Sequence, residues 1–182
     1  RLIGSGFIGG KAVGMLLARK ILSQTSTEWH RLIEPHDSFY IGSDVFYSYL
    51  IDNNLWKLKM AQQRATTDSL AKAQMLQEGI LKGQFNPFIR NKLLRMLEYF
   101  GQSPIIVRSS SLLEDGFSNA FPGKYKSIFC TNQGTLEERY HLLAQAIREI
   151  YASAFSEDAL AYREKHNLRD TEEQMALLVQ RV

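Results

Sequence analysis

The clearest structural signal in this chain is an apolar stripe at helical spacing between residues 136 and 155. Residues three and four positions apart lie on one face of an α-helix, so this segment is predicted to form a helix with one buried face. We interpret its aromatic members as core residues rather than as a ligand-binding cluster. Whatever fold the chain adopts must therefore bury the apolar face of this helix. The stripe consists of Leu136, Tyr140, Leu143, Ala144, Ile147, Tyr151 and Phe155.

Shorter helical and extended patterns alternate along the rest of the chain. Asn86 followed by Pro87 is typical of a helix start, and Gly101 is typical of a helix end. Ser43 is predicted to cap another helix. Helix is in the majority, so the predicted class is α+β, or α/β, and helix-rich. The further predicted helices cover about 11–23, 43–50, 61–82 and 158–166, and the predicted strands cover 39–41, 104–107, 125–130 and 175–182.

Composition and charge exclude several classes of protein. The longest nearly apolar run, 12–18, has seven residues, whereas a membrane-spanning helix needs about 20. The chain carries a net charge of +3 without a run rich in lysine and arginine, so neither a membrane nor nucleic acid is an expected partner. The single cysteine, Cys130, cannot form an intrachain disulfide, and we interpret it as a small core residue. It favours a reducing, cytoplasmic location.

A glycine-rich segment lies near the start of the chain. Gly4, Gly6 and Gly9 satisfy the spacing G-x-G-x-x-G, but only three residues precede them, and the nearest acidic residue that follows is Glu28. This context is poor for a dinucleotide-binding loop, so a Rossmann-type oxidoreductase is the weakest of our hypotheses. Lys11 comes next, at the expected start of a helix, where its charge adds to the positive end of the helix dipole. It is a candidate phosphate ligand, the alternative being a solvated lysine.

A second polar cluster follows the predicted strand 104–107. A strand end gives Arg108 a rigid support, and its guanidinium suits bidentate binding of a phosphate or a carboxylate. The alternative is a capping box from Ser111 to Glu114, which would merely begin a helix. Glu114 and Asp115 offer oxygen ligands for Mg²⁺, or they form a solvated acidic pair.

The segment 121–124 is predicted to be a tight turn before the strand 125–130. In a purely structural interpretation it only reverses the chain. In a functional one, the Gly123 amide and the Ser127 hydroxyl contact a phosphate. The histidines show no metal-ligand spacing, and we interpret them as surface or partly packed residues. They are His30, His36, His141 and His166.

Five short motifs occur in order along the chain: Gly-Gly-Lys-Ala at 9–12, Val-Arg-Ser-Ser at 107–110, Glu-Asp at 114–115, Phe-x-Gly at 121–123 and Val-Gln-x-Val at 179–182. This order resembles the nucleotide-binding domain of phosphoenolpyruvate synthase and pyruvate phosphate dikinase. The family also includes the glucan, water dikinases and the rifampin phosphotransferases. The resemblance covers nearly the whole chain, and it implies an ATP-grasp-like fold that holds ATP between two subdomains.

The resemblance also implies roles for individual residues. Lys11 and Arg108 would contact the phosphates of ATP and act in catalysis. Gly123 and Ser127 would line the phosphate side, and Gln180 would lie at the hinge strand beside the adenine. Members of the family transfer the β-phosphoryl group of ATP to a histidine on a separate swivelling domain and release AMP, with Mg²⁺ bridging the phosphates.

The same resemblance implies that this chain holds an incomplete site. The chain opens on Arg1, and the predicted strand 175–182 ends it without a turn signal. We therefore expect residues 1–182 to be the N-terminal part of the domain, truncated at the hinge strand and inactive alone. The phosphohistidine and acceptor-binding domains are expected elsewhere in the parent chain. Pro122, Lys124 and Val182 depart from the family pattern, which motivates an alternative: a degenerate module that senses a nucleotide or mediates an interaction without catalysis.

Overall fold

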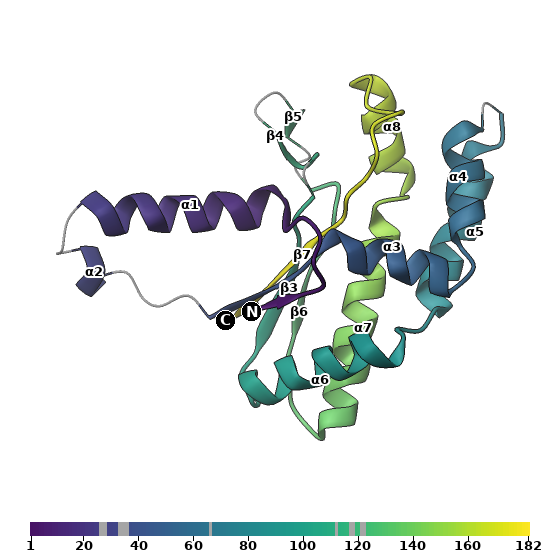
Figure 1. The fold of residues 1–182 in the computed structure, drawn as a ribbon. Helices are drawn as coiled ribbons and strands as arrows, with labels where there is room; N and C mark the ends of the chain where they lie inside the picture. The colour runs from purple at the N-terminus through teal and green to yellow at the C-terminus, as the bar shows by residue number, and fades with distance from the viewer. Residues whose placement is uncertain (26–28, 33–36, 66, 112, 117–118, 121–122) are drawn as a thin grey trace.

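A five-stranded mixed sheet joins the two ends of the chain (Figure 1). The computed structural model describes residues 1–182 except 26–28, 33–36, 66, 112, 117–118 and 121–122, and it describes the backbone alone at 30–31, 115–116 and 119–120. The strand order is β1 (Leu2–Ile3), β2 (Ser38–Ile41), β7 (Leu177–Arg181), β3 (Ile105–Ser109) and β6 (Ser127–Cys130). β1 and β2 are parallel, and the other neighbours are antiparallel. Because β7 lies between β2 and β3, the centre of the sheet forms only when distant parts of the chain meet.

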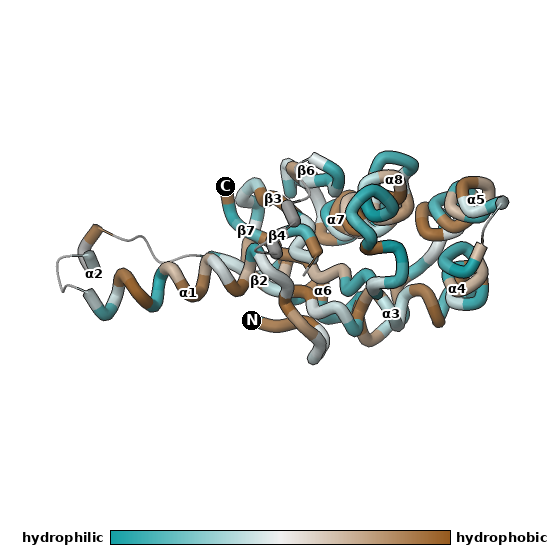
Figure 2. The backbone as a smooth tube through the Cα atoms, turned by 90° about the horizontal axis from the view of Figure 1, so that it is seen from above, coloured by the Kyte–Doolittle hydropathy of each residue, from teal (hydrophilic) through white to brown (hydrophobic). Residues whose placement is uncertain are grey.

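The helices surround this sheet unequally. The main core on one side takes side chains from α3, α5, α6 and α7, whereas α1 contacts the other side and extends away from the body, with α2 beyond its far end (Figures 1 and 2). No helix among the described residues is both long enough and apolar enough to cross a membrane. The helices are α1 (Gly9–Thr25), α2 (Trp29–Leu32), α3 (Ser43–Asp52), α4 (Trp56–Arg64), α5 (Ser69–Lys82), α6 (Pro87–Phe100), α7 (Leu136–Ser153) and α8 (Glu157–Lys165), and a short pair is formed by β4 (Asp115–Gly116) and β5 (Asn119–Ala120).

Alternation along β3 separates the two faces of the sheet. Ile105 and Val107 are fully buried against the main core, and Ile106 and Arg108 point to the opposite face, because successive side chains of a strand alternate. The apolar stripe predicted between 136 and 155 is buried in the same core. The prediction of a helix-rich α+β fold is therefore confirmed.

Two helix ends were predicted from local sequence and are confirmed. The Asn86 Oδ1 accepts the amide of Ile89 at 2.9 Å and caps α6, and Gly101, with φ +59°, follows its last residue. A third cap was not predicted: Thr135 and Glu138 form a reciprocal capping box at the start of α7. The caps at Asn86 and Thr135 satisfy amides that the first turn of a helix leaves without partners.

The segment 61–82, predicted to be helical, is divided between two helices. α4 ends at Arg64 and α5 begins at Ser69. The intervening sequence contains Thr67 and Asp68, residue types whose side chains compete for backbone hydrogen bonds and favour turns over helix interiors.

Two predicted capping serines serve other contacts. Ser43 is the first residue of α3 rather than its cap, and its hydroxyl accepts the amide of Phe7 at 3.2 Å. No helix starts at Ser111 in the described residues around it: its hydroxyl accepts the amide of Leu113 at 3.0 Å, and the chain continues into β4. Both hydroxyls fix loops, which is the other common use of serine side chains.

Candidate functional site

The start of α1 is bonded to the segment that follows β3. The Ser110 hydroxyl accepts the amide of Ala12 at 3.1 Å and donates to the carbonyl of Ile8 at 2.8 Å. Gly9 has φ +77° and packs so closely on Ser110 that a Cβ atom would overlap its carbonyl oxygen. Both the backbone conformation and this contact therefore require glycine. The start of α1 and the end of β3 consequently share one corner of the molecule.

Gly9→Ala is expected to lower the free energy of unfolding by about 1–3 kcal/mol, because alanine is strained at a positive φ and would collide with Ser110. Gly14, on the same helix, is a matched control, since a Cβ there meets nothing within 4 Å. Gly14→Ala is expected to stabilise by up to about 1 kcal/mol. Urea unfolding of both variants measures the difference, and equal stabilities would contradict the packing at Gly9.

The glycine-rich loop binds a carboxylate of its own chain. The amides of Ser5 and Gly6 donate to the Asp44 carboxylate at 2.9 and 2.8 Å. The amide of Phe7 donates to the hydroxyl of Ser43. These donors are satisfied inside the protein, so the loop is not the dinucleotide cradle that its glycine spacing resembles.

Lys11 is partly buried and forms an ion pair with Glu114; 20% and 9% of the two side chains are exposed. Lys11 is therefore not a freely solvated lysine, and Glu114 is not a solvated acid. A phosphate ligand would have to share the ammonium with this carboxylate. Among the described side chains, which do not include that of Asp115, no group of three histidine, cysteine or acidic residues could hold a metal ion.

Arg108 and Ser127 lie directly opposite each other in the β3–β6 register. Opposed residues of antiparallel strands share a face, with Cβ atoms about 4.5–5.5 Å apart. The neighbouring pair on that face is Ile106 and Phe129. Ser127 is exposed, and 70% of Phe129 is exposed. This part of the sheet, which we call the open face, therefore offers a cation, a hydroxyl and an apolar surface together.

Gln180 lies on the same face of β7, opposite Ile106 of β3. Its side-chain amide is 3.4 Å from the Ser38 hydroxyl and 3.4 Å from the sulfur of Met15 on α1. The contact with the hydroxyl is long for a hydrogen bond. Gln180 thus marks the border between the area covered by α1 and the open face.

A model of the family described as "Pyruvate phosphate dikinase, AMP/ATP-binding domain" matches residues 5–182. The chain belongs to this family. No curated protein matches the chain. The resemblance predicted from the ordered motifs is confirmed, and with it an ATP-binding domain of the dikinase type and an ATP-grasp-like fold. The oxidoreductase hypothesis is therefore dropped.

Gly123 lies apart from the other predicted ligands of this dikinase domain. It has φ +69° and lines a pocket together with Lys124 and, from α7, Arg148 and Ser153. α7 packs on the core side of the sheet, whereas Arg108 points to the opposite side. The preceding residues 121–122, which carry the rest of the motif, lie outside the described part of the chain. The role of Gly123 beside a phosphate stays a prediction.

Cys130 and the histidines were interpreted as core, surface or partly packed residues. The described ones, Cys130, His141 and His166, have such positions in the dikinase domain. Cys130 is buried, and burial raises the pKa of its thiol to about 11. His166 stacks on Tyr162, and exposed His141 lies 3.3 Å from Glu137. The side chains of the two other histidines lie outside the described residues.

Sequence reasoning missed Phe129 as part of the open face. The available signal was the alternation along 125–130, which places Phe129 on the same side as Ser127. It also missed the pairing of Glu114 with Lys11, which no local pattern indicates.

Proposed function

We propose that this chain is the first part of the ATP-binding domain of a dikinase-type phosphotransferase, in which Lys11 and Arg108 hold the phosphates of ATP. The observation that carries the proposal is the bonding of the α1 start to the segment after β3 through Ser110. This bonding brings α1, which carries Lys11, and β3, which carries Arg108, together beside the open face. There Ser127 lies opposite Arg108. Phosphates favour guanidinium, ammonium and hydroxyl donors.

In the proposed reaction the β-phosphoryl group of ATP passes to a histidine on another domain, and AMP is released. Phosphoryl transfer gains mainly from positioning and from cations that offset the spreading charge. Arg108, supported by β3, would orient the phosphates, and Lys11 would exchange its contact with Glu114 for one with them. We expect Mg²⁺ to come with the nucleotide, where it would neutralise phosphate charge. Gln180, beside the open face, is the proposed neighbour of the adenine.

The outer side of α1 supports the proposal that further parts of the domain complete the site. Val13, Leu17 and Ile21 lie one helical turn apart, and 49%, 57% and 54% of them are exposed. α1 also extends away from the body in both views (Figures 1 and 2). We expect the remaining part of the ATP-grasp-like domain to cover this stripe and to close over the nucleotide.

Lys11→Ala in the full-length protein is expected to abolish AMP formation from ATP, because it removes the ammonium proposed to bind the phosphates. The matched control is Lys20→Ala, since Lys20 is exposed on the same helix. The measurement separates AMP, ADP and ATP by chromatography after incubation with Mg·ATP. AMP formation by Lys11→Ala at the wild-type rate would refute the assigned role.

One observation favours a second candidate function, a module that senses a nucleotide without catalysis. The loop amides and Lys11 already bind Asp44 and Glu114, so part of the expected phosphate site is engaged with internal carboxylates. The same assay distinguishes the two functions when Mg·ATP binding and phosphohistidine are measured beside it. Binding of Mg·ATP with no AMP and no phosphohistidine would establish the second candidate, and AMP release would exclude it.

A further inference from the structure

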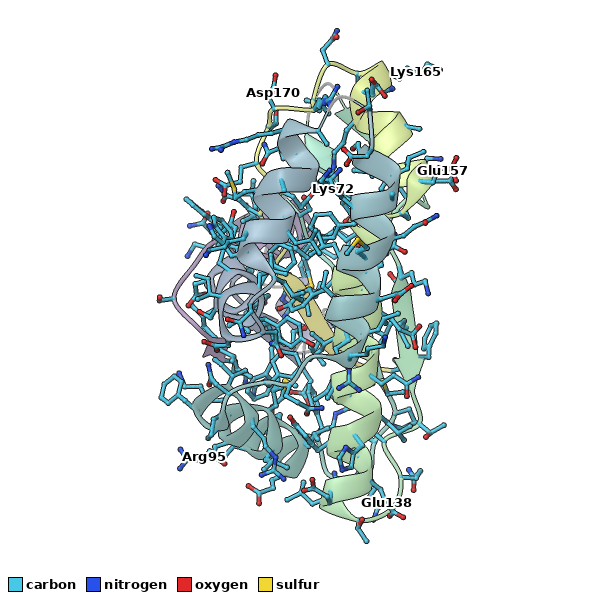
Figure 3. The ribbon with its side chains drawn as sticks, turned by 90° about the vertical axis from the view of Figure 1, so that its right-hand side faces the viewer. Lys72, Arg95, Glu138, Glu157, Lys165 and Asp170 are labelled. Atoms are coloured by element: carbon cyan, nitrogen blue, oxygen red, sulfur yellow. The ribbon has the colours of Figure 1, made fainter. Side chains whose placement is uncertain are left out.

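A second pocket lies outside the open face, between α4, the start of α5, α8 and the segment that follows α8. Figure 3 faces this end of the molecule: α4 and α5, the latter carrying Lys72, run side by side, and α8, with Glu157 and Lys165, rises beside their upper ends. The pocket has a volume of about 480 Å³. This falls within the range of small-molecule sites, about 300–1,000 Å³.

The walls of this pocket contain buried polar side chains from three elements. Only 4% of Lys59, 6% of Gln62, 7% of Arg163 and 2% of Glu173 are exposed. Burying charged groups is costly unless they are paired and hydrogen-bonded. The partners of each group therefore indicate which of them a ligand would satisfy.

Arg163 forms a close ion pair within the protein, whereas Lys59 has no carboxylate of the described residues at hydrogen-bond distance. Arg163 donates to Glu173 at 2.8 Å. The Lys59 ammonium donates to the neutral side chain of Gln63 at 3.2 Å, and the carboxylate within 4 Å of it is that of half-exposed Glu172, at 3.9 Å. Burial lowers the pKa of Lys59, although Glu172 opposes this effect. Lys59 is thus a buried cation in the wall of the pocket, with the Glu172 carboxylate 3.9 Å away.

The start of α5 adds donors to the same pocket. Ser69, Leu70 and Ala71 all line it, and the first intrahelical hydrogen bond of α5 runs from the Lys72 amide to the Asp68 carbonyl. The amides of the first turn have no acceptor within the helix and carry the positive end of its dipole. The Asp68 side chain does not cap them, because it pairs with Lys72.

The pocket wall also contains a hydrogen-bond acceptor, the carboxylate of Glu173. Among the described residues, the buried Oε1 atom of Glu173 has no hydrogen-bond partner, while its Oε2 atom binds Arg163 and Tyr125. A ligand that fits both groups carries an anion for Lys59 and a hydroxyl or amino donor for Glu173.

We propose that this pocket binds a small hydroxy or amino acid, with its acidic group on Lys59 and the first-turn amides of α5 and its hydroxyl or amine on Glu173. The site is separate from the proposed nucleotide site and does not depend on it. A ligand there would tie the α4–α5 pair to α8, so it would stabilise the domain by an amount that grows with the logarithm of its concentration above the dissociation constant.

Titration of the full-length protein tests this proposal, with lactate, L-serine and 3-phosphoglycerate as probes. Trp56 reports binding by fluorescence, because the Lys59 ammonium lies 5.0 Å from the centre of its ring; Trp29→Phe removes the signal of the other tryptophan of residues 1–182. A saturable fluorescence change and a rise in melting temperature are expected with at least one probe. Lys59→Met should weaken its binding about tenfold or more, since it removes a charge-assisted hydrogen bond.

Two controls keep the result specific. Lys57→Met changes an exposed lysine of the same helix and should leave binding unchanged. Lys11→Ala should also leave it unchanged, which separates this pocket from the proposed phosphate site. Lys59→Gln gives a second variant if methionine alters the fold. The proposal is overturned if none of the three probes binds at up to millimolar concentration, or if both Lys59 variants bind as the wild type does.

Discussion

Glu173→Gln is expected to lower the free energy of unfolding by about 3–5 kcal/mol, because it leaves the Arg163 guanidinium buried without a counter-charge. The two side chains are 1% and 8% exposed and 2.8 Å apart. Tyr125 donates to Glu173 and accepts from Arg163 at 2.8 Å. Arg163 also donates to the carbonyl of Ala154 at 2.9 Å, so the network joins α8 and the segment after it to the end of α7.

Urea unfolding measures this effect, and a double-mutant cycle isolates the pair. Arg163→Met alone should also destabilise strongly, because it leaves the carboxylate buried. In the double variant Arg163→Met with Glu173→Gln, the free energy of unfolding should fall by less than the sum of the two single decreases, since no uncompensated charge remains. A loss below about 1 kcal/mol for Glu173→Gln would show that the pair is not buried as described.

Arg108→Met is expected to weaken the binding of ATP to the full-length protein about 100-fold. The reason is that a hydrogen bond to a charged group contributes about 1.5–3 kcal/mol, and a guanidinium can make two of them to one phosphate. The dissociation constant of Arg108→Lys should lie between those of the wild type and Arg108→Met. Lysine keeps the positive charge but cannot make the two parallel hydrogen bonds of a guanidinium. Isothermal titration with Mg·ATP gives the three dissociation constants.

Arg95→Met is the matched control for this experiment. Arg95 is exposed on α6, at the lower end of the molecule in Figure 3. Its replacement should not change the dissociation constant. If Arg108→Met bound ATP as tightly as Arg95→Met does, the open face would not be the phosphate site.

Features set by neighbouring residues were predictable from the sequence. The cap at Asn86, the end at Gly101 and the buried stripe of α7 depend on contacts within one or two turns. The family motifs could also be recognised in the sequence, because each consists of a few consecutive residues. The break between α4 and α5 was missed because the composition around it is helix-prone on both sides.

Features made by distant residues were not predictable. Glu114 was interpreted as a metal ligand or a solvated acid, yet it lies beside Lys11 because Ser110 holds the start of α1. Nothing near Arg163 in the sequence indicates that Glu173 and Tyr125 surround it. Such contacts depend on the strand order of the sheet, which places β7 between β2 and β3.

The most direct test of the nucleotide-binding claim is the melting temperature of the full-length protein with and without Mg·ATP, repeated for Lys11→Ala and Lys20→Ala. A ligand at 100 times its dissociation constant adds about 2.7 kcal/mol to the stability of the folded state. The account predicts a rise for the wild type and for Lys20→Ala, and little or no rise for Lys11→Ala. A wild type that does not respond to saturating Mg·ATP, or an equal rise in all three proteins, would contradict it.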